Sequence, residues 1–204
     1  MIAIVDYGVG NLFSLRSSFR KIGAEAVVTG DKSVIENADK ILLPGVGAFA
    51  DAAEKLRRSG LDEVVKAEVK KGKYMLGICL GMQLLFEKSY EYGEHEGLGL
   101  LKGKVVPMKD YIDPALKIPH IGWNGLQFTR PHFLFERVKN GDYAYFVHSF
   151  HAVDCEECVI AQTEYDKLFT ASVAKDNVLG CQFHPEKSGD VGLNILRAFV
   201  EKKD

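Results

Sequence analysis

Cys79 lies in the segment Gly77-Ile78-Cys79-Leu80-Gly81, in which a nucleophile stands between two glycines, each two residues away. This pattern is typical of a nucleophile elbow, a sharp turn between a strand and a helix that holds a reactive side chain exposed. The glycines permit so tight a turn, and the N–H of Leu80 would then serve as an oxyanion donor. The alternative is a buried cysteine at a glycine-rich strand end. The motif alone supports both interpretations about equally.

A cysteine nucleophile needs a base, and His184-Pro185-Glu186 supplies an imidazole and a carboxylate two residues apart. In an extended segment these two side chains would lie on the same side, and Pro185 disfavours a helix between them. His184 would accept the thiol proton while Glu186 holds the other ring nitrogen. A plain surface turn is the commoner explanation of such a tripeptide on its own. Because His184 and Cys79 are far apart in the chain, only the fold can bring them together.

The segment Pro44-Gly45-Val46-Gly47 follows directly after the apolar run Ile41–Leu43. Its two glycines allow a peptide to flip or to approach a ligand closely. Loops after parallel strands gather at the carboxyl edge of the sheet, where Cys79 is also expected. The N–H of Val46 or Gly47 could therefore supply a second oxyanion donor, although an ordinary strand-to-helix turn explains the motif equally simply.

Two further motifs are weaker. Gly8-Val9-Gly10 lacks the third glycine of a dinucleotide loop, because Phe13 occupies that position. Cys155 and Cys158 have the spacing of metal ligands but no second pair, and Cys181 or His151 would have to complete a site. We therefore expect no metal and no cofactor.

The apolar pattern predicts strands alternating with helices in the first half of the chain. Asn11 is predicted to cap the first helix and Gly23 to end it. Strands are expected at Ile2–Val5, Ala26–Val28, Ile41–Leu43 and Tyr74–Ile78, and further helices at 51–71, broken at Ser59-Gly60, and at Leu80–Glu87. This alternation favours an α/β fold with a mostly parallel central sheet flanked by helices.

After residue 100 the pattern changes to short strands, followed by a last helix from about Asp190. The expected short strands lie at Val105-Val106, Leu126–Phe128, Tyr145–Val147, Val159–Gln162, Thr170–Val173 and Leu179–Phe183. With no repeat, linker or low-complexity stretch, residues 1–204 are predicted to form a single domain.

Composition excludes several classes of partner. The 204 residues carry a net charge of −2 without a long basic run, so no affinity for nucleic acid is expected. No apolar stretch reaches the roughly 18 residues of a membrane helix, and the N-terminus is better explained as a strand than as a signal peptide. Four cysteines are too few for a disulfide scaffold in a chain of this length, which favours a reducing, cytoplasmic location.

Taken together, the motifs around Cys79, His184 and residues 44–47 resemble the triad-type, or class I, glutamine amidotransferases, whose sheet is flavodoxin-like. Within them, the chain is most similar to the glutaminase subunits of imidazole glycerol phosphate synthase, of histidine biosynthesis. The segments that carry this closer resemblance are 5–11 (VDYGVGN), 119–124 (PHIGWN), 145–149 (YFVHS) and 184–188 (HPEKS).

The resemblance implies that Cys79 attacks the glutamine side-chain amide to form a thioester, that His184 carries the proton, and that Glu186 orients His184. It also implies an oxyanion hole at Leu80, Val46 and Gly47, and a glutamine pocket at Gly47, Gln83, Ser149 and Phe150. Members pair as heterodimers with a (β/α)8-barrel cyclase subunit that receives the ammonia, and the implied interface residues are Trp123, Tyr145 and Lys187.

Three other functions stay open. The chain could serve a different synthase, since the acceptor domain lies elsewhere. It could be a cysteine peptidase or hydrolase on a similar sheet, acylated by peptides rather than by glutamine analogues. It could also be a non-catalytic subunit with a relic elbow, although the retained Cys79, His184 and Glu186 argue against that.

Overall fold

The computed structural model describes residues 1–203 and is organised around an eight-stranded sheet with the order β2-β1-β3-β4-β14-β13-β12-β9. The first five strands are parallel, and β13, β12 and β9 continue the sheet antiparallel. The parallel part has the order of a flavodoxin-like sheet, which confirms the expected fold class. The strands are β1 (Ile2–Val5), β2 (Ala26–Thr29), β3 (Lys40–Leu43), β4 (Tyr74–Ile78), β9 (Gln127–Phe128), β12 (Val159–Tyr165), β13 (Lys167–Lys175) and β14 (Val178–Cys181).

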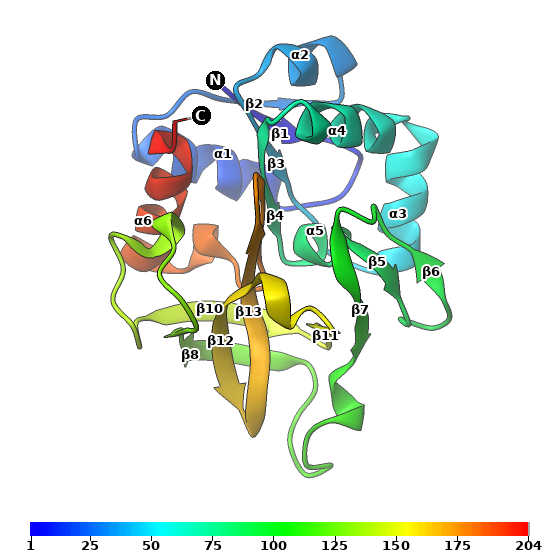
Figure 1. Cartoon of the computed structure of the whole chain (residues 1–204), viewed down its shortest axis with the longest axis vertical. Coiled ribbons are helices and arrows are strands. Elements are labelled where there is room, and N and C mark those ends of the chain that lie inside the picture. The colour runs from blue at the N-terminus through cyan, green and yellow to red at the C-terminus, as the bar shows by residue number, and fades with distance from the viewer. Residues whose placement is uncertain (204) are drawn as a thin grey trace.

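Helices cover both faces of the parallel strands. In Figure 1, α1 and α6 lie on one side of the sheet and α3 and α4 on the other. Successive side chains of a strand point to opposite faces, so Ile2 and Ile4 pack in one core cluster while Ala3 and Val5 pack in the other. The helices are α1 (Leu12–Lys21), α2 (Lys32–Asn37), α3 (Phe49–Arg58), α4 (Leu61–Lys70), α5 (Leu80–Gln83) and α6 (Gly189–Glu201). Among the described residues, no helix is long and apolar enough to cross a membrane.

Two small sheets stand beside the carboxyl edge of the parallel strands. One has the order β11-β7-β5-β6 and the other is the antiparallel pair β10-β8. Their strands are β5 (Phe86–Ser89), β6 (His95–Glu96), β7 (Leu101–Pro107), β8 (His120–Gly125), β10 (Tyr143–His148) and β11 (Phe150–Val153). Short 3-10 turns are η1 (Met108–Asp110), η2 (Phe133–Phe135), η3 (Glu156–Cys158) and η4 (Pro185–Lys187). In Figure 1, β8, β10 and β11 lie below the parallel strands of the main sheet, and residues of β10 and β11 line the same pocket as Cys79 at the end of β4.

The structure confirms the break between two helices at Ser59-Gly60, where Gly60 has the left-handed φ of 65°. The predicted helix Leu80–Glu87 is wrong: α5 ends at Gln83, and Phe86–Ser89 forms strand β5 against β7. The apolar run over residues 84–86 fits either structure, and pairing with β7 decides between them. Asn11 stands at the start of α1, but its side chain makes no capping hydrogen bond.

Candidate active site

Cys79 sits at the end of β4 in a strained conformation, with φ 53° and ψ −112°. Positive φ is rare for residues other than glycine and is concentrated at functional sites. The Cys79 N–H donates to the carbonyl of Cys181 at 2.7 Å, which ties the turn to the neighbouring strand β14. The strand, the turn and the start of α5 therefore form the elbow that the glycine spacing indicates.

The two glycine motifs of the sequence pack directly on each other. A Cβ on Gly81 would stand 1.9 Å from the carbonyl oxygen of Leu43, and a Cβ on Gly45 would stand 2.6 Å from the nitrogen of Gly81. No side chain fits at either distance, so both positions require glycine. This contact holds the loop Pro44–Gly47 against Leu80, next to Cys79. Tyr7 supports the loop from behind, because its hydroxyl donates to the carbonyl of Pro44 at 2.7 Å.

His184 lies between Cys79 and Glu186. Its Nδ1 is 2.8 Å from Oε1 of Glu186, and it lines the same pocket as Cys79. Burial alone would lower the pKa of His184, but its interactions with the Cys79 and Glu186 side chains outweigh burial and raise this pKa to about 9. The imidazole therefore keeps its proton at neutral pH, beside the sulfur.

The predicted extended conformation of His184–Glu186 is wrong. Pro185–Lys187 form the 3-10 turn η4, with Pro185 at its first position, where a missing N–H costs nothing. The turn still brings the carboxylate of Glu186 onto the ring of His184. The backbone of His184 is fixed on both sides, since its N–H donates to the carbonyl of Tyr145 at 2.9 Å and its carbonyl accepts from the Ser188 hydroxyl at 2.7 Å.

A pocket of about 360 Å³ opens above these residues. Every residue expected to form an oxyanion hole or to bind glutamine lines it, namely Val46, Gly47, Leu80, Gln83, Ser149 and Phe150. The pocket also contains residues that the sequence did not indicate, namely Glu91, Pro119, Val147 and His148. A larger hollow of about 750 Å³ lies between residues 128 and 140 and contains no cysteine, so chemistry rather than size identifies the site.

Two buried glutamines connect the pocket to Cys79. The Gln83 amide nitrogen donates to the carbonyl of Phe150 at 3.2 Å and to Oε1 of Gln182 at 3.0 Å. Gln182 is fully buried, and its own amide nitrogen lies 3.7 Å from the sulfur of Cys79. No sequence motif indicates Gln182, because its contact with Cys79 depends on the pairing of β14 with β4.

Glu91 contributes a carboxylate to the lining of the pocket. One of its oxygens accepts from the N–H of Phe49 at 2.7 Å, which fixes the side chain at the pocket wall. Burial raises the pKa of Glu91 above its ordinary value, although the Phe49 hydrogen bond opposes this. Nothing in the surrounding sequence distinguishes Glu91 from the exposed acidic residues near it.

The three expected interface residues form one surface cluster beside the pocket. The ring of Trp123 lies 5.9 Å from that of Tyr145, and Nζ of Lys187 lies 5.8 Å from the centre of the Tyr145 ring. Trp123 is half exposed, and Lys187 also lines the pocket. The structure therefore brings together residues from β8, β10 and η4 that are far apart in the chain.

The residues of the two weaker motifs do not line the pocket of Cys79. Within residues 1–203 there is no group of three or more side chains suited to a metal ion. Gly10 packs against Pro44, where a Cβ would come within 2.9 Å of the proline ring, so the glycines near residue 8 serve the loop after β3 rather than a phosphate.

Comparison with known proteins assigns the family. The model of class I glutamine amidotransferases matches residues 3–203. The imidazole glycerol phosphate synthase subunit HisH of Sulfurimonas denitrificans is 52% identical over 100% of this chain and 99% of its own length. The corresponding subunit of Wolinella succinogenes is 49% identical, over 98% and 99%. A crystal structure of a glutamine amidotransferase superposes with a TM-score of 0.75 at 20% identity, covering 97% of this chain and 98% of that one.

The fold and the pocket thus define an α/β enzyme with a cysteine at a strand–helix elbow. The chain belongs to the class I glutamine amidotransferases.

Proposed function

We propose that this chain is the glutaminase subunit of imidazole glycerol phosphate synthase, and that Cys79, His184 and Glu186 are its catalytic residues. The observation that carries the catalytic assignment is that Cys79 and His184 line one pocket while Nδ1 of His184 lies 2.8 Å from the Glu186 carboxylate. The full-length similarity to HisH subunits at about 50% identity supports the particular synthase.

In the proposed reaction, the Cys79 sulfur attacks the side-chain carbonyl of glutamine and forms a tetrahedral intermediate. His184 gives its proton to the departing amide nitrogen, which leaves as ammonia, and a thioester remains. Water then attacks the thioester and His184 accepts and keeps the proton of the water. The bond between the carbonyl carbon and the sulfur breaks, glutamate is released, and the protonated imidazole again stands beside the free sulfur. Glu186 holds the ring of His184 in position throughout, as the 2.8 Å contact indicates.

The oxyanion of the tetrahedral intermediate would be held by the N–H of Leu80 and by the loop Pro44–Gly47. Leu80, Val46 and Gly47 line the pocket, and the glycine contact described above holds the loop beside Leu80. Gly47 has φ +92°, a conformation that leaves its peptides free to turn. We infer that one peptide of this loop must reorient to complete the oxyanion hole.

The partner would dock on the surface formed by Trp123, Tyr145 and Lys187. Trp and Tyr are enriched among the residues that contribute most to binding energy at interfaces, and Lys187 of the same cluster also lines the pocket. A cyclase barrel bound at this surface would receive the ammonia directly as it leaves the pocket of Cys79. The four free cysteines agree with work in the reducing cytoplasm.

The test of this function is glutamine turnover with and without the cyclase subunit. We expect the isolated chain to be slow and the complex to be about 10²–10³-fold faster, since that is the effect of one oxyanion donor. Glutamate release is measured by a coupled assay, and a second cyclase-like barrel from an unrelated pathway serves as the control partner. Full turnover by the isolated chain would contradict the loop rearrangement, and no turnover in either state would contradict the function.

Replacing Glu91 by glutamine is expected to raise KM for glutamine about 10- to 100-fold with little change in kcat. The free ammonium of the substrate needs a carboxylate partner, and a hydrogen bond to a charged group contributes about 1.5–3 kcal/mol. Steady-state kinetics measures the effect, with Glu94→Gln as the matched control, because Glu94 is exposed and pairs with Lys88. An unchanged KM for glutamine would show that Glu91 does not bind the substrate.

The pH profile should show an alkaline limb near pH 9. Because the pKa of His184 is raised to about 9, the imidazolium is retained below that pH and lost above it. The proton for the leaving ammonia is lost with it, so kcat/KM should fall about tenfold per pH unit above pH 9. Glu186→Gln removes one of the groups that raise the pKa and should move this limb to lower pH, whereas exposed Glu63→Gln should not. If the alkaline limb of Glu186→Gln stayed near pH 9, Glu186 would not be a cause of the raised pKa of His184.

A further inference from the structure

Cys155 and Cys158 lie at the two ends of one tight turn, far from the proposed active site. The N–H of Cys158 donates to the carbonyl of Cys155 at 2.9 Å, which closes a four-residue turn just before β12. Residues at the ends of such a turn have Cα atoms less than about 7 Å apart. Disulfides span Cα separations of about 4.4–6.8 Å, so this backbone is compatible with a bond between the two sulfurs.

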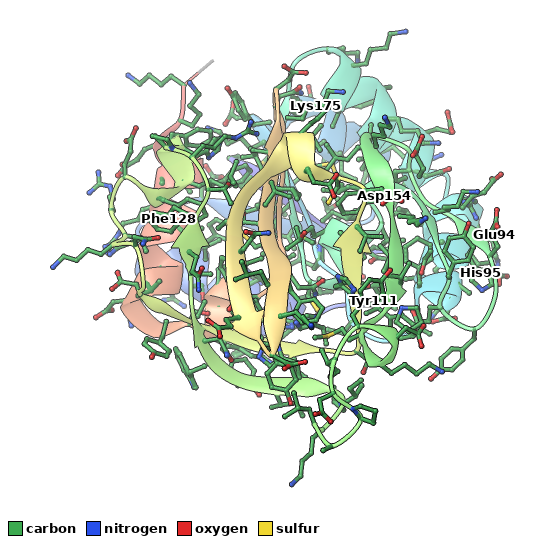
Figure 2. The ribbon with its side chains drawn as sticks, turned by 60° about the horizontal axis from the view of Figure 1, so that its bottom comes forward. Glu94, His95, Tyr111, Phe128, Asp154 and Lys175 are labelled. Carbon is green, nitrogen blue, oxygen red and sulfur yellow. The ribbon has the colours of Figure 1, made fainter. Side chains whose placement is uncertain are left out.

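Both cysteines belong to a core cluster and also line a small pocket. The pocket has a volume of about 200 Å³, and both cysteines line it together with Lys102, Asp154 and Lys175. Asp154 and Lys175 are labelled in Figure 2, near the η3 turn. Each cysteine is only 5% exposed, but the pocket gives a small molecule access to the sulfurs.

The two thiols differ in their ease of ionisation. The Cys158 thiol donates to the carbonyl of Cys155 at 3.2 Å. The interaction with the Cys155 thiol, and after it the charges of Arg130 and Lys175, lower the pKa of Cys158 despite its burial. The interaction between the two thiols and burial raise the pKa of Cys155. A thiol that ionises easily, in contact with one that keeps its proton, corresponds to the attacking and resolving members of a redox pair.

Cys181 provides a contrast within the same chain. It is completely buried in β14, where its neighbour is the Ser172 hydroxyl at 3.8 Å. Burial raises the pKa of Cys181 to about 12. Cys181 therefore has the surroundings of an unreactive, structural cysteine. A metal does not explain the pair of Cys155 and Cys158 either, since residues 1–203 offer no third ligand beside it.

We propose that Cys155 and Cys158 are a redox-active dithiol, which a hydroperoxide oxidises to a disulfide and a cellular dithiol reduces again. The Cys158 thiolate attacks the peroxide oxygen, the O–O bond breaks, and Cys158 becomes a sulfenic acid while the released hydroxide takes up a proton to form water. The Cys155 sulfur then attacks the Cys158 sulfur, the S–S bond forms, and the sulfenic oxygen leaves as a second water with the Cys155 proton. Two thiols and one peroxide give one disulfide and two waters.

Hydrogen peroxide is the probe, and the chain with Cys79→Ala is the substrate, because Cys79 would otherwise be oxidised as well. After treatment the chain is denatured, alkylated and digested with trypsin, and the masses of the peptides are measured by mass spectrometry. Cys155 and Cys158 fall in one tryptic peptide, residues 140–167. We expect this peptide to lose two hydrogens and to resist alkylation, and to recover both thiols after a dithiol reductant, while Cys181 remains alkylated throughout.

Single serine variants test the assigned roles. In Cys155→Ser, Cys158 should accumulate as a sulfenic acid that a dimedone reagent traps. In Cys158→Ser, oxidation of Cys155 should be at least about tenfold slower, since a thiol that keeps its proton is a poor nucleophile. Thermal melting checks that both variants fold, and the Cys79→Ala result stands without them. The proposal fails if the peptide keeps its mass and both thiols under peroxide that oxidises Cys79 of the wild type, or if any disulfide involves Cys181. Neither outcome bears on glutamine hydrolysis.

Discussion

Replacing Cys79 by alanine should abolish glutamine hydrolysis. Removing a nucleophile that acts together with its base costs roughly 10⁴–10⁶ in kcat, because the pocket and the oxyanion donors then have no covalent intermediate to stabilise. Synthesis by the partner from added ammonium salt should continue unchanged, since the cyclase chemistry does not use Cys79. Glutamate release and product formation are measured separately in the complex, the first from glutamine and the second from free ammonia.

The matched control is Cys155→Ser, which changes a cysteine outside the pocket and should leave glutamine turnover as it is. A covalent test uses a glutamine analogue with an electrophilic side chain, which should label the wild type once, at Cys79. Hydrolysis that survives in Cys79→Ala would show that another group is the nucleophile. Labelling by peptide analogues instead of the glutamine analogue would favour a peptidase.

The second large effect is expected from Gly81→Ala. A single methyl there would meet the carbonyl oxygen of Leu43 at 1.9 Å, and this neighbour is backbone and cannot rotate away. The elbow and the loop after β3 must then separate. Overpacking of this kind typically costs 1–3 kcal/mol, and we expect about 3 kcal/mol or more here, together with a fall in kcat of at least about 10²-fold from misplacement of the sulfur.

Chemical denaturation measures the stability and single-turnover kinetics the activity. Gly23→Ala is the control, because Gly23 also lies next to a helix end, has φ +76°, and has no atom within 4 Å of its added Cβ. It should lose only about 1 kcal/mol, from backbone strain alone, and keep its activity. If Gly81→Ala behaved like Gly23→Ala, the contact between the two glycine motifs would not position the site.

Much of the architecture was predictable from local pattern. Short continuous apolar runs make up β1 and most of β3, and such runs are typical of strands with both faces buried. The break between α3 and α4 follows from Gly60, which readily adopts the left-handed conformation found there. The glycines around Cys79 likewise predict the elbow. Steric clashes act between atoms a few bonds apart, so the types of the neighbouring residues already show where a tight turn is possible.

Elements whose structure depends on distant partners were not predictable in the same way. The residues from Phe86 to Ser89 become strand β5 because β7 offers a pairing edge. His184 and Glu186 meet through a 3-10 turn rather than an extended segment, because hydrogen bonds from Tyr145 and Ser188 fix the backbone there. Local propensity is weaker than these long-range contacts, and a single sequence does not contain their geometry.

The sequence by itself determined which chemistry this protein has available: a cysteine on a tight turn, an imidazole with a carboxylate two residues away, and glycines where backbone must approach backbone. The tertiary structure adds that Cys79 and His184 share one pocket with Glu91, that Gln182 contacts the sulfur of Cys79, and that Tyr145 contacts both Trp123 and Lys187 at the rim. The difference arises from the distance in the chain over which the two kinds of interaction act. Turn and strand preferences come from atoms a few bonds apart, whereas the meeting of β4, β14 and β10 depends on burying both faces of a whole sheet at once.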